Sequence, residues 1–402
     1  MPGPLDGYRV IDLTAMISGP LATMVLADQG ADVIKVENPA GGDHTRESSN
    51  LSNGFSASFL NNNRNKRSVA LNLKDARGIE ALKRLVAEAD VFVQNFRPGV
   101  VDRMGIGEAA LRAVRPDLIY VSISGFGQEG PFAHKPVYDP LVQALSGLAT
   151  VQAGSDQERP RLVRTILPDK LTGTVAAQAI TAALLARART GEGQHVKVSM
   201  LASVVAFLWG SDMGSQTFVG GELPQQAAAS FIDLIYRTAD GHVSVAVQSN
   251  KEWQALTRAL ERPEWLDDPR FLTPALRQDN INDRLALTQE VLETKGSTHW
   301  LERLEAEGVP CAPVLTRTEV IAHPQILAEG IIAESDHTAA GRLRQSRPAA
   351  LFSGTPTELR YGGPALGEHT EEVLAAAGYG DDVLRALRQD GVIAGKSRRD
   401  AA

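Results

Sequence analysis

The sequence predicts an α/β protein with a doubly wound, mostly parallel β-sheet and a smaller α+β domain. Over residues 8–200, short apolar segments of strand length alternate with helical segments, which is typical of parallel sheets covered by helices. The 402 residues are too many for one simple core, and the composition changes near residue 220. The change of composition indicates that another domain begins near residue 220.

The elements of the first half follow in regular order. Strands are predicted over residues 8–13, 32–37, 67–73, 90–96, 118–124 and 195–200. A helix over residues 20–29 has Pro20 in its first turn and ends at Gly30, positions that these residue types favour. Asp75 caps a helix whose apolar residues share one face, namely Ile79, Leu82, Leu85 and Val86. A long alanine-rich helix follows Pro168 and runs to about Arg189.

The second half predicts a small domain inserted into the large one. The predicted boundaries are 1–224 for the first part of the large domain, 225–329 for the small domain and 330–402 for the return. A loop or linker is predicted over residues 220–230. A strand pair, 232–238 and 242–248, is joined by an Ala-Asp-Gly turn and followed by two or three amphipathic helices. The end of the chain predicts a helix over 371–377 and a frayed tail over 396–402.

Charge and cysteine content narrow the classes of function. The formal net charge is −7, which argues against a nucleic-acid partner or an anionic membrane surface. The single cysteine, Cys311, excludes a disulfide within the chain and any cysteine-based metal site, and we expect it to be a buried, inert thiol. The histidines show no metal-binding spacing, so no metal is predicted.

We expect a cytoplasmic protein. The first twelve residues lack the basic head and apolar stretch of a signal peptide. No apolar run approaches the roughly 20 residues that span a bilayer, and the longest, 174–186, fits a buried helix.

Several common nucleotide-binding and hydrolase motifs are absent. The turn after the first strand has no Gly-x-Gly-x-x-Gly, and the chain has no P-loop and no Gly-x-Ser-x-Gly. One Gly-x-Gly-x-x-Gly begins at Gly125, but Pro131 and Pro136 follow it, so it predicts a loop. An ordinary NAD-dependent enzyme or a P-loop kinase is therefore disfavoured.

Basic residues gather near the ends of predicted strands. They are Arg64, Lys66, Arg67, Lys74, Arg97 and Arg103. Such residues bind the phosphates of a nucleotide-like ligand or simply form a solvated surface charge. Charge alone leaves both interpretations open.

Asp169 begins the long helix after Pro168. The helix dipole favours an ionised carboxylate at that position. An aspartate there is either a helix N-cap or a catalytic group, and the local residues leave both roles open.

Several segments together resemble the class III CoA-transferases. They include 30–37 (GADVIKVE) with Gly42, Asp43 and Arg46, then 65–74 (NKRSVALNLK), 89–99 (ADVFVQNFRPG) and 103–105, and also 124–127 with 130–131, 236–241, 308–313 and 367–370. The segments occur in the family's order along nearly the whole chain. Their combination is specific, although each segment alone is weak.

This resemblance implies a large Rossmann-like domain, a smaller α+β domain and a homodimer of interlocked subunits. It also implies that Asp169 is the nucleophile that carries CoA between acids through a mixed anhydride and an aspartyl-CoA thioester. The substrates would be an acyl-CoA, with coenzyme A as the transferred group, and a small carboxylic acid. No tightly bound cofactor is expected.

The resemblance also implies the CoA-binding residues. They are Ile17, Ser18, Asn38, Leu71, Asn72, Leu73, Lys74, Asn95, Phe96, Arg97, Arg103, Val137 and Tyr138. Leu71 and Leu73 would flank the adenine, and Lys74, Arg97 and Arg103 would face phosphates.

The sequence departs from the family pattern at two places. Asn38 stands where arginine is common, which puts one CoA contact in doubt. Ala15 and Ile17 replace the His and Gln of formyl-CoA transferases, which argues against oxalate or formate as the substrate.

Two other functions remain as alternatives. The related α-methylacyl-CoA racemases use a histidine where this chain has Tyr138, so two-base proton transfer would lose one partner. A non-catalytic CoA-binding protein is the second alternative, and the presence of Asp169 at the nucleophile position argues against it.

Overall fold

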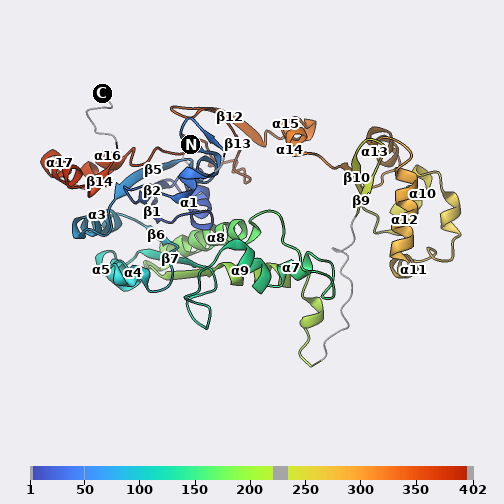
Figure 1. Ribbon diagram of the computed structural model, residues 1–402, viewed down its shortest axis with the longest axis horizontal. Coiled ribbons are helices and arrows are strands. Elements are labelled where there is room, and N and C mark those ends of the chain that lie inside the picture. The colour runs from blue at the N-terminus through green and yellow to red at the C-terminus, as the bar shows by residue number, and fades with distance from the viewer. Residues whose placement is uncertain (1–2, 49, 221–233, 396–402) are drawn as a thin grey trace. The chain divides into compact units, whose positions relative to one another are not determined.

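The computed structural model describes residues 3–48, 50–220 and 234–395 (Figure 1). The chain divides into two compact units, Met1–Ala227 with Gly330–Ala402, and Ala228–Glu329. Most of the linker predicted over 220–230, the start of the strand predicted over 232–238 and the tail over 396–402 lie outside the described residues.

The first unit is built on a seven-stranded sheet with the order β14-β5-β2-β1-β6-β7-β8. The strands are β1 (Arg9–Leu13), β2 (Asp32–Glu37), β5 (Lys66–Leu71), β6 (Val91–Gln94), β7 (Ile119–Ser124), β8 (His195–Ser199) and β14 (Ile393–Ala394). All pairings are parallel except that of β14 with β5. In chain order the six parallel strands read 3-2-1-4-5-6, the order of doubly wound nucleotide-binding folds. The predicted mostly parallel sheet is confirmed.

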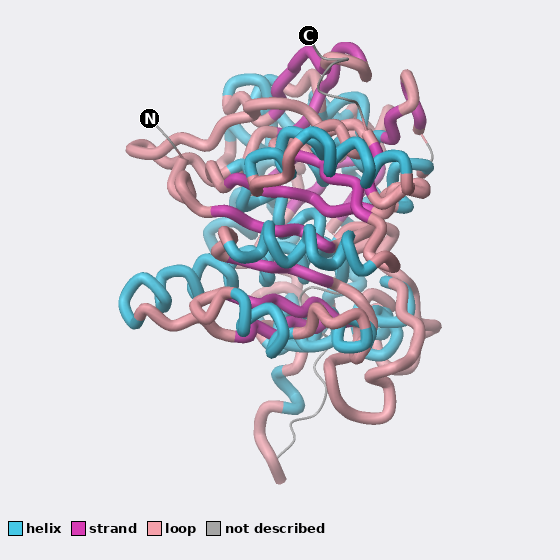
Figure 2. The backbone as a smooth tube through the Cα atoms, turned by 90° about the vertical axis from the view of Figure 1, so that its left-hand side faces the viewer, coloured by secondary structure: helices cyan, strands magenta, loops and turns pink. Residues whose placement is uncertain are grey.

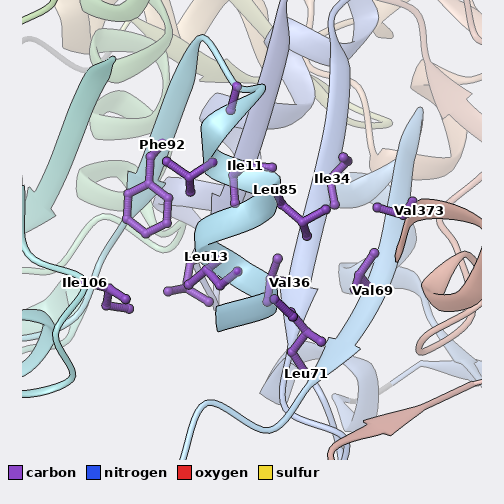
Figure 3. Close-up of a cluster of buried hydrophobic side chains, with 14 of the residues drawn as sticks. Ile11, Leu13, Ile34, Val36, Val69, Leu71, Leu85, Phe92, Ile106 and Val373 are labelled. Atoms are coloured by element: carbon purple, nitrogen blue, oxygen red, sulfur yellow. The ribbon is translucent and has the colours of Figure 1, made fainter. Parts of the chain in front are cut away.

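Two layers of helices cover the sheet (Figures 1 and 2). On one face, α1 (Ser18–Asp28) and α8 (Leu167–Thr190) pack against β1, β2, β6 and β7. On the other face lie α3 (Ala76–Ala87), α5 (Glu108–Val114), α16 (Thr370–Ala376) and α17 (Asp381–Gln389). Figure 3 shows Leu85 of α3 between Ile11 and Ile34 of the strands, and the three belong to one buried cluster with Val36. Burying these aliphatic side chains contributes roughly 1.5–3 kcal/mol each.

The helix α8 (Leu167–Thr190) confirms the long alanine-rich helix predicted after Pro168. The apolar run over 174–186 was predicted to be too short to cross a membrane, but α8 spans 24 residues and passes a test of length and composition for a membrane span. Core helices of soluble proteins pass the same test. Ala176, Ile180 and Leu184 of α8 are buried in the core against α1 and the sheet.

Shorter elements complete the first unit. They are the strands β3 (Leu51–Ser52), β4 (Phe55–Ser56), β12 (Ile332–His337) and β13 (Gly341–Ser346), and the helices α2 (Ala57–Asn63), α4 (Val100–Arg103), α6 (Asp139–Leu145), α7 (Leu148–Val151) and α9 (Met200–Trp209). β3 pairs with β4, and β12 pairs with β13, both antiparallel.

The second unit has a three-stranded sheet and its own aromatic core. Its strands are β9 (Ile235–Arg237), β10 (His242–Val245) and β11 (Cys311–Pro313), and its helices are α10 (Asn250–Ala259), α11 (Pro274–Asp279), α12 (Ile281–Leu292), α13 (Ser297–Ala306), α14 (Arg317–Val320) and α15 (Pro324–Ala328). β9 and β10 form the predicted antiparallel pair. Cys311 is only half-buried, not buried as predicted, and burial raises the pKa of its thiol.

Candidate active site

The loops that follow β1, β2, β5 and β6 surround the larger of two adjoining cavities, about 1240 Å³ in volume. In doubly wound sheets, ligands bind outside the carboxyl ends of the strands where the strand order reverses, which here is between β1 and β6. Eight of the predicted CoA-binding residues line this cavity: Asn38, Leu71, Asn72, Leu73, Lys74, Asn95, Phe96 and Arg103.

The charges of the larger cavity favour an anion. Its carboxylates Glu37, Asp43 and Asp75 are each paired with a neighbouring cation. Lys74 and Arg103 are exposed, and neither forms a side-chain hydrogen bond or ion pair with any residue that the structure describes. The carboxylates are thus neutralised by other cations, while Lys74 and Arg103 are not neutralised by any of the described residues. The cavity therefore has a positive potential, although the protein as a whole is acidic.

The smaller cavity, about 370 Å³, contains Asp169. The other predicted residues Ile17, Ser18, Arg97, Val137 and Tyr138 line it. Met16, Asn95 and Phe96 line both cavities, so the two adjoin at these three residues. Arg97 therefore lines the cavity that contains Asp169, whereas Lys74 and Arg103, with which the resemblance had grouped it, line the larger cavity.

Asp169 is the third residue of α8, and its side chain faces the start of α1. The N-cap of α8 is Ile166, so the interpretation of Asp169 as the cap is wrong. The Ser18 hydroxyl donates a short hydrogen bond to Asp169 Oδ1. Asp139 Oδ2 accepts a hydrogen bond from the Asp169 backbone N–H at 3.2 Å and satisfies one of the free N–H groups of the first turn.

The electrostatic surroundings of Asp169 differ from the prediction of a dipole-stabilised carboxylate. Burial raises the pKa of Asp169, and the Asp139 charge raises it further. The Ser18 hydroxyl and backbone N–H lower the pKa of Asp169, but they do not offset the burial. The result is a carboxylate more basic than an exposed aspartate.

Gly173 allows α8 to approach α1 closely enough for this contact. It lies one helical turn after Asp169, and a Cβ there would stand 2.8 Å from the Ser18 carbonyl oxygen. Real Cβ atoms essentially never come so close to a backbone oxygen. A side chain at residue 173 would therefore push Asp169 away from Ser18.

Buried ion pairs lie beneath the larger cavity. Lys66 Nζ donates to Asp12 Oδ2 at 2.9 Å, and both side chains are 0% exposed. Lys35, also fully buried, pairs with Asp43 at 3.0 Å. Burial opposes ionisation of Asp12, but Lys66 and Lys35 hold the pKa of Asp12 well below its usual range. Burial lowers the pKa of Lys66 to about 8, and the Asp12 charge opposes this shift.

Ion pairs also decide the roles of Arg64, Lys66 and Arg67, for which the sequence left two interpretations: phosphate binding or a solvated surface charge. Arg64 binds Asp28 at 2.8 Å and Arg67 binds Asp32 at 2.6 Å, while Lys66 is fully buried. The three side chains are neither phosphate ligands nor a solvated surface set. Each is held in an ion pair within the first unit: Arg64 with Asp28 of α1, Lys66 with Asp12 of β1 and Arg67 with Asp32 of β2.

A family model described as "CoA-transferase family III" matches residues 5–370. The chain belongs to CoA-transferase family III. The succinyl-CoA:glutarate CoA-transferase of Mus musculus is 34% identical over 97% of this chain and 90% of its own length. The acetyl-CoA:oxalate CoA-transferase of Acetobacter aceti is 35% identical over 91% of this chain and 94% of its own. A crystal structure of a CaiB/BaiF family protein from Brucella suis is 32% identical, covers 94% of this chain and 100% of its own, and has a TM-score of 0.83.

Membership of the family makes the chain a CoA-transferase, whose substrates are CoA thioesters. All fourteen residues predicted for the site line one of the two adjoining cavities. Three residues that sequence reasoning did not single out are Asp139, Gly173 and Met16. The sequence carried one signal for them, since Asp139 directly follows Tyr138, the residue that stands at the position of the racemase histidine.

Proposed function

We propose that this transferase moves CoA through covalent intermediates on Asp169. The observation that carries the proposal is the position of this carboxylate. The smaller cavity has two carboxylates, and the one on Asp139 is buried and accepts hydrogen bonds from the Asp169 backbone and from Gln143. Asp169 is only partly buried, so its carboxylate is the one that a thioester can reach.

The proposed sequence of steps needs no external energy. The Asp169 carboxylate attacks the thioester carbonyl, the C–S bond breaks, and CoA leaves as a thiolate from a mixed anhydride. The thiolate attacks the aspartyl carbonyl and releases the donor acid, leaving an aspartyl-CoA thioester. The acceptor carboxylate then displaces the thiolate to form a second anhydride, and the thiolate attacks the acceptor carbonyl. The products are the new thioester and free Asp169.

Ser18 supports both kinds of intermediate. It is the first residue of α1, so its backbone N–H belongs to the positive end of that helix. Its hydroxyl and N–H both interact with the Asp169 carboxylate. When the aspartyl carbonyl is attacked, the same donors face the oxygen on which negative charge develops.

The larger cavity is proposed to bind the nucleotide half of CoA, and the pantetheine arm would pass Met16, Asn95 and Phe96 to reach Asp169. Arg103→Ala should weaken CoA binding by roughly 1.5–3 kcal/mol, because a charge-assisted contact to phosphate is lost. Calorimetric titration with CoA measures this loss. Arg385→Ala, which removes an exposed arginine of α17, is the matched control. Equal affinities for the two variants would place the phosphates elsewhere.

The acids exchanged are proposed to be dicarboxylates larger than oxalate. The two relatives described above are named for succinyl-CoA with glutarate and for acetyl-CoA with oxalate. The apolar Ile17 lines the cavity of Asp169, which disfavours the small, highly polar acids. Mass spectrometry of the acyl-CoA products from a panel of oxalate, formate, succinate, glutarate and butyrate identifies the acceptor class. Transfer to oxalate or formate alone would contradict this part of the proposal.

A homodimer is proposed as the active form. Large apolar side chains are exposed on α6, before α8 and on α9, and these elements pack on one another: Leu141, Leu145, Leu162, Ile166, Phe207 and Trp209. Exposed apolar surface of this extent marks a protein interface. Light scattering should give twice the chain mass of 43.1 kDa, and a stable species of 43.1 kDa at micromolar concentration would contradict the dimer.

A further inference from the structure

The chain between β1 and α1 is held by buried side chains at the point where the two cavities meet. Lys35 Nζ donates to the Thr14 carbonyl at 2.8 Å. The Asn95 side chain donates to the Ala15 carbonyl at 2.8 Å and accepts from the Ala15 N–H at 3.0 Å. The polar backbone groups of two successive residues are therefore fixed by side chains from β2 and from the loop after β6.

The next residue, Met16, has an unusual backbone. Its φ is 72°, in the left-handed region that glycine and asparagine adopt far more readily than methionine. The residue is 40% exposed and lines both cavities. Ser18, which contacts Asp169, lies only two residues further on. Rotation of Met16 to a negative φ would redirect the chain before it reaches Ser18.

One side chain binds the strained residue directly. Asp43 Oδ1 accepts a hydrogen bond from the Met16 N–H at 3.2 Å. Asp43 is 3% exposed and is itself held by Lys35 at 3.0 Å and by the Thr45 N–H at 2.9 Å. Neighbours from β2 and from the turn after it therefore keep this acceptor in place.

We propose that Asp43 is a positioning residue that holds Met16 in the left-handed conformation and thereby places Ser18 against Asp169. Strained residues cluster at active sites and persist only where the surroundings over-determine them. The hydrogen bonds around Met16 are such surroundings. This inference rests on the proposed role of Asp169.

Substitution of Met16 tests the importance of the left-handed backbone. Gly and Asn tolerate a positive φ, whereas the β-branched Val resists it. All three substitutions remove the Met16 side chain from the cavities, so the comparison is made among them. We expect the kcat of Met16→Gly and of Met16→Asn to exceed that of Met16→Val by about tenfold or more. The site is partly exposed, so all three variants should fold, and thermal denaturation checks this. A greater kcat for Met16→Val than for Met16→Gly and Met16→Asn would overturn the proposal.

A double-mutant cycle tests the role of Asp43. Asp43→Ala removes the acceptor for the Met16 N–H, whereas Asp43→Asn keeps an amide oxygen in its place. Both substitutions weaken the pairing with Lys35. We expect kcat to fall about thirtyfold in Asp43→Ala and at most about fivefold in Asp43→Asn. In a Met16→Gly background, Asp43→Ala should cost no more than about threefold, because glycine does not need to be held.

The outcomes separate this inference from the mechanism on which it rests. Asp43→Ala could lower kcat by the same factor in the Met16→Gly background as in the unchanged enzyme. That result would show that Asp43 acts only through the packing of Lys35, and it would overturn the proposal. So would equal losses in Asp43→Ala and Asp43→Asn. If Asp43→Ala does not fold, the residue 16 series decides alone. Transfer without any adduct on Asp169 would instead contradict the proposed function.

Discussion

Asp169→Asn should reduce CoA transfer by at least about a thousandfold while leaving the fold and CoA affinity close to those of the unchanged enzyme. An amide has nearly the size of a carboxylate, but it is a poor nucleophile. The helix α8 loses no cap, because its N-cap is Ile166. Initial rates of acyl-CoA exchange, circular dichroism and CoA calorimetry measure the three quantities.

A matched control removes a carboxylate from the same part of another helix. Asp381 also lies in the first turn of its helix, α17, and it is exposed. Asp381→Asn should leave the rate unchanged. Full activity in Asp169→Asn would exclude the covalent mechanism. A loss of activity together with a loss of helical signal would show that residue 169 acts on the fold.

Asp12→Ala should lower the free energy of unfolding of the first unit by roughly 3–5 kcal/mol, because it leaves a buried ammonium without its counter-charge. Lys66 is 0% exposed, and its other partners are the neutral oxygens of Pro20 and Asn63. Two neutral acceptors do not replace a carboxylate at 2.9 Å.

Hydrogen exchange of β1 and β5 is the suitable measurement, because three of the four tryptophans lie in the other unit: Trp253, Trp265 and Trp300. Glu88→Ala is the control, since its ion pair with Arg9 is exposed and should be worth at most about 1 kcal/mol. Equal losses in the two variants would show that the buried pair contributes no more than a surface pair.

Much of the first unit could be predicted from the sequence because its strands are buried on both faces. In the sequence, fully buried parallel strands appear as short apolar runs. The segments between them repeat their apolar residues every 3.6 positions, which indicates helices. The ends of the elements were less predictable. The strand predicted to end at Leu73 ends at Leu71, because the chain turns at Asn72, whose side chain accepts from the Lys74 N–H. The helix α9 was missed, although Ser199 caps its first turn and the sequence held that signal.

The resemblance named residues that line the two cavities, but it did not give their physical setting. No local pattern shows that Lys35 and Lys66 are buried, because their partners Asp43 and Asp12 lie 8 and 54 positions away. The left-handed backbone of Met16 has no sequence signal either, since Met is not a residue type that favours it. Both features arise only when the strand ends come together.

The most direct test of the central claim is to trap the aspartyl intermediate. The enzyme would be mixed with an acyl-CoA that it turns over, quenched with hydroxylamine and digested, and the modified peptide would be sequenced by mass spectrometry. The covalent mechanism predicts a hydroxamate on Asp169, formed only with substrate and absent from Asp169→Asn. A hydroxamate on another residue, or none during rapid transfer, would contradict the claim that Asp169 carries CoA between the two acids.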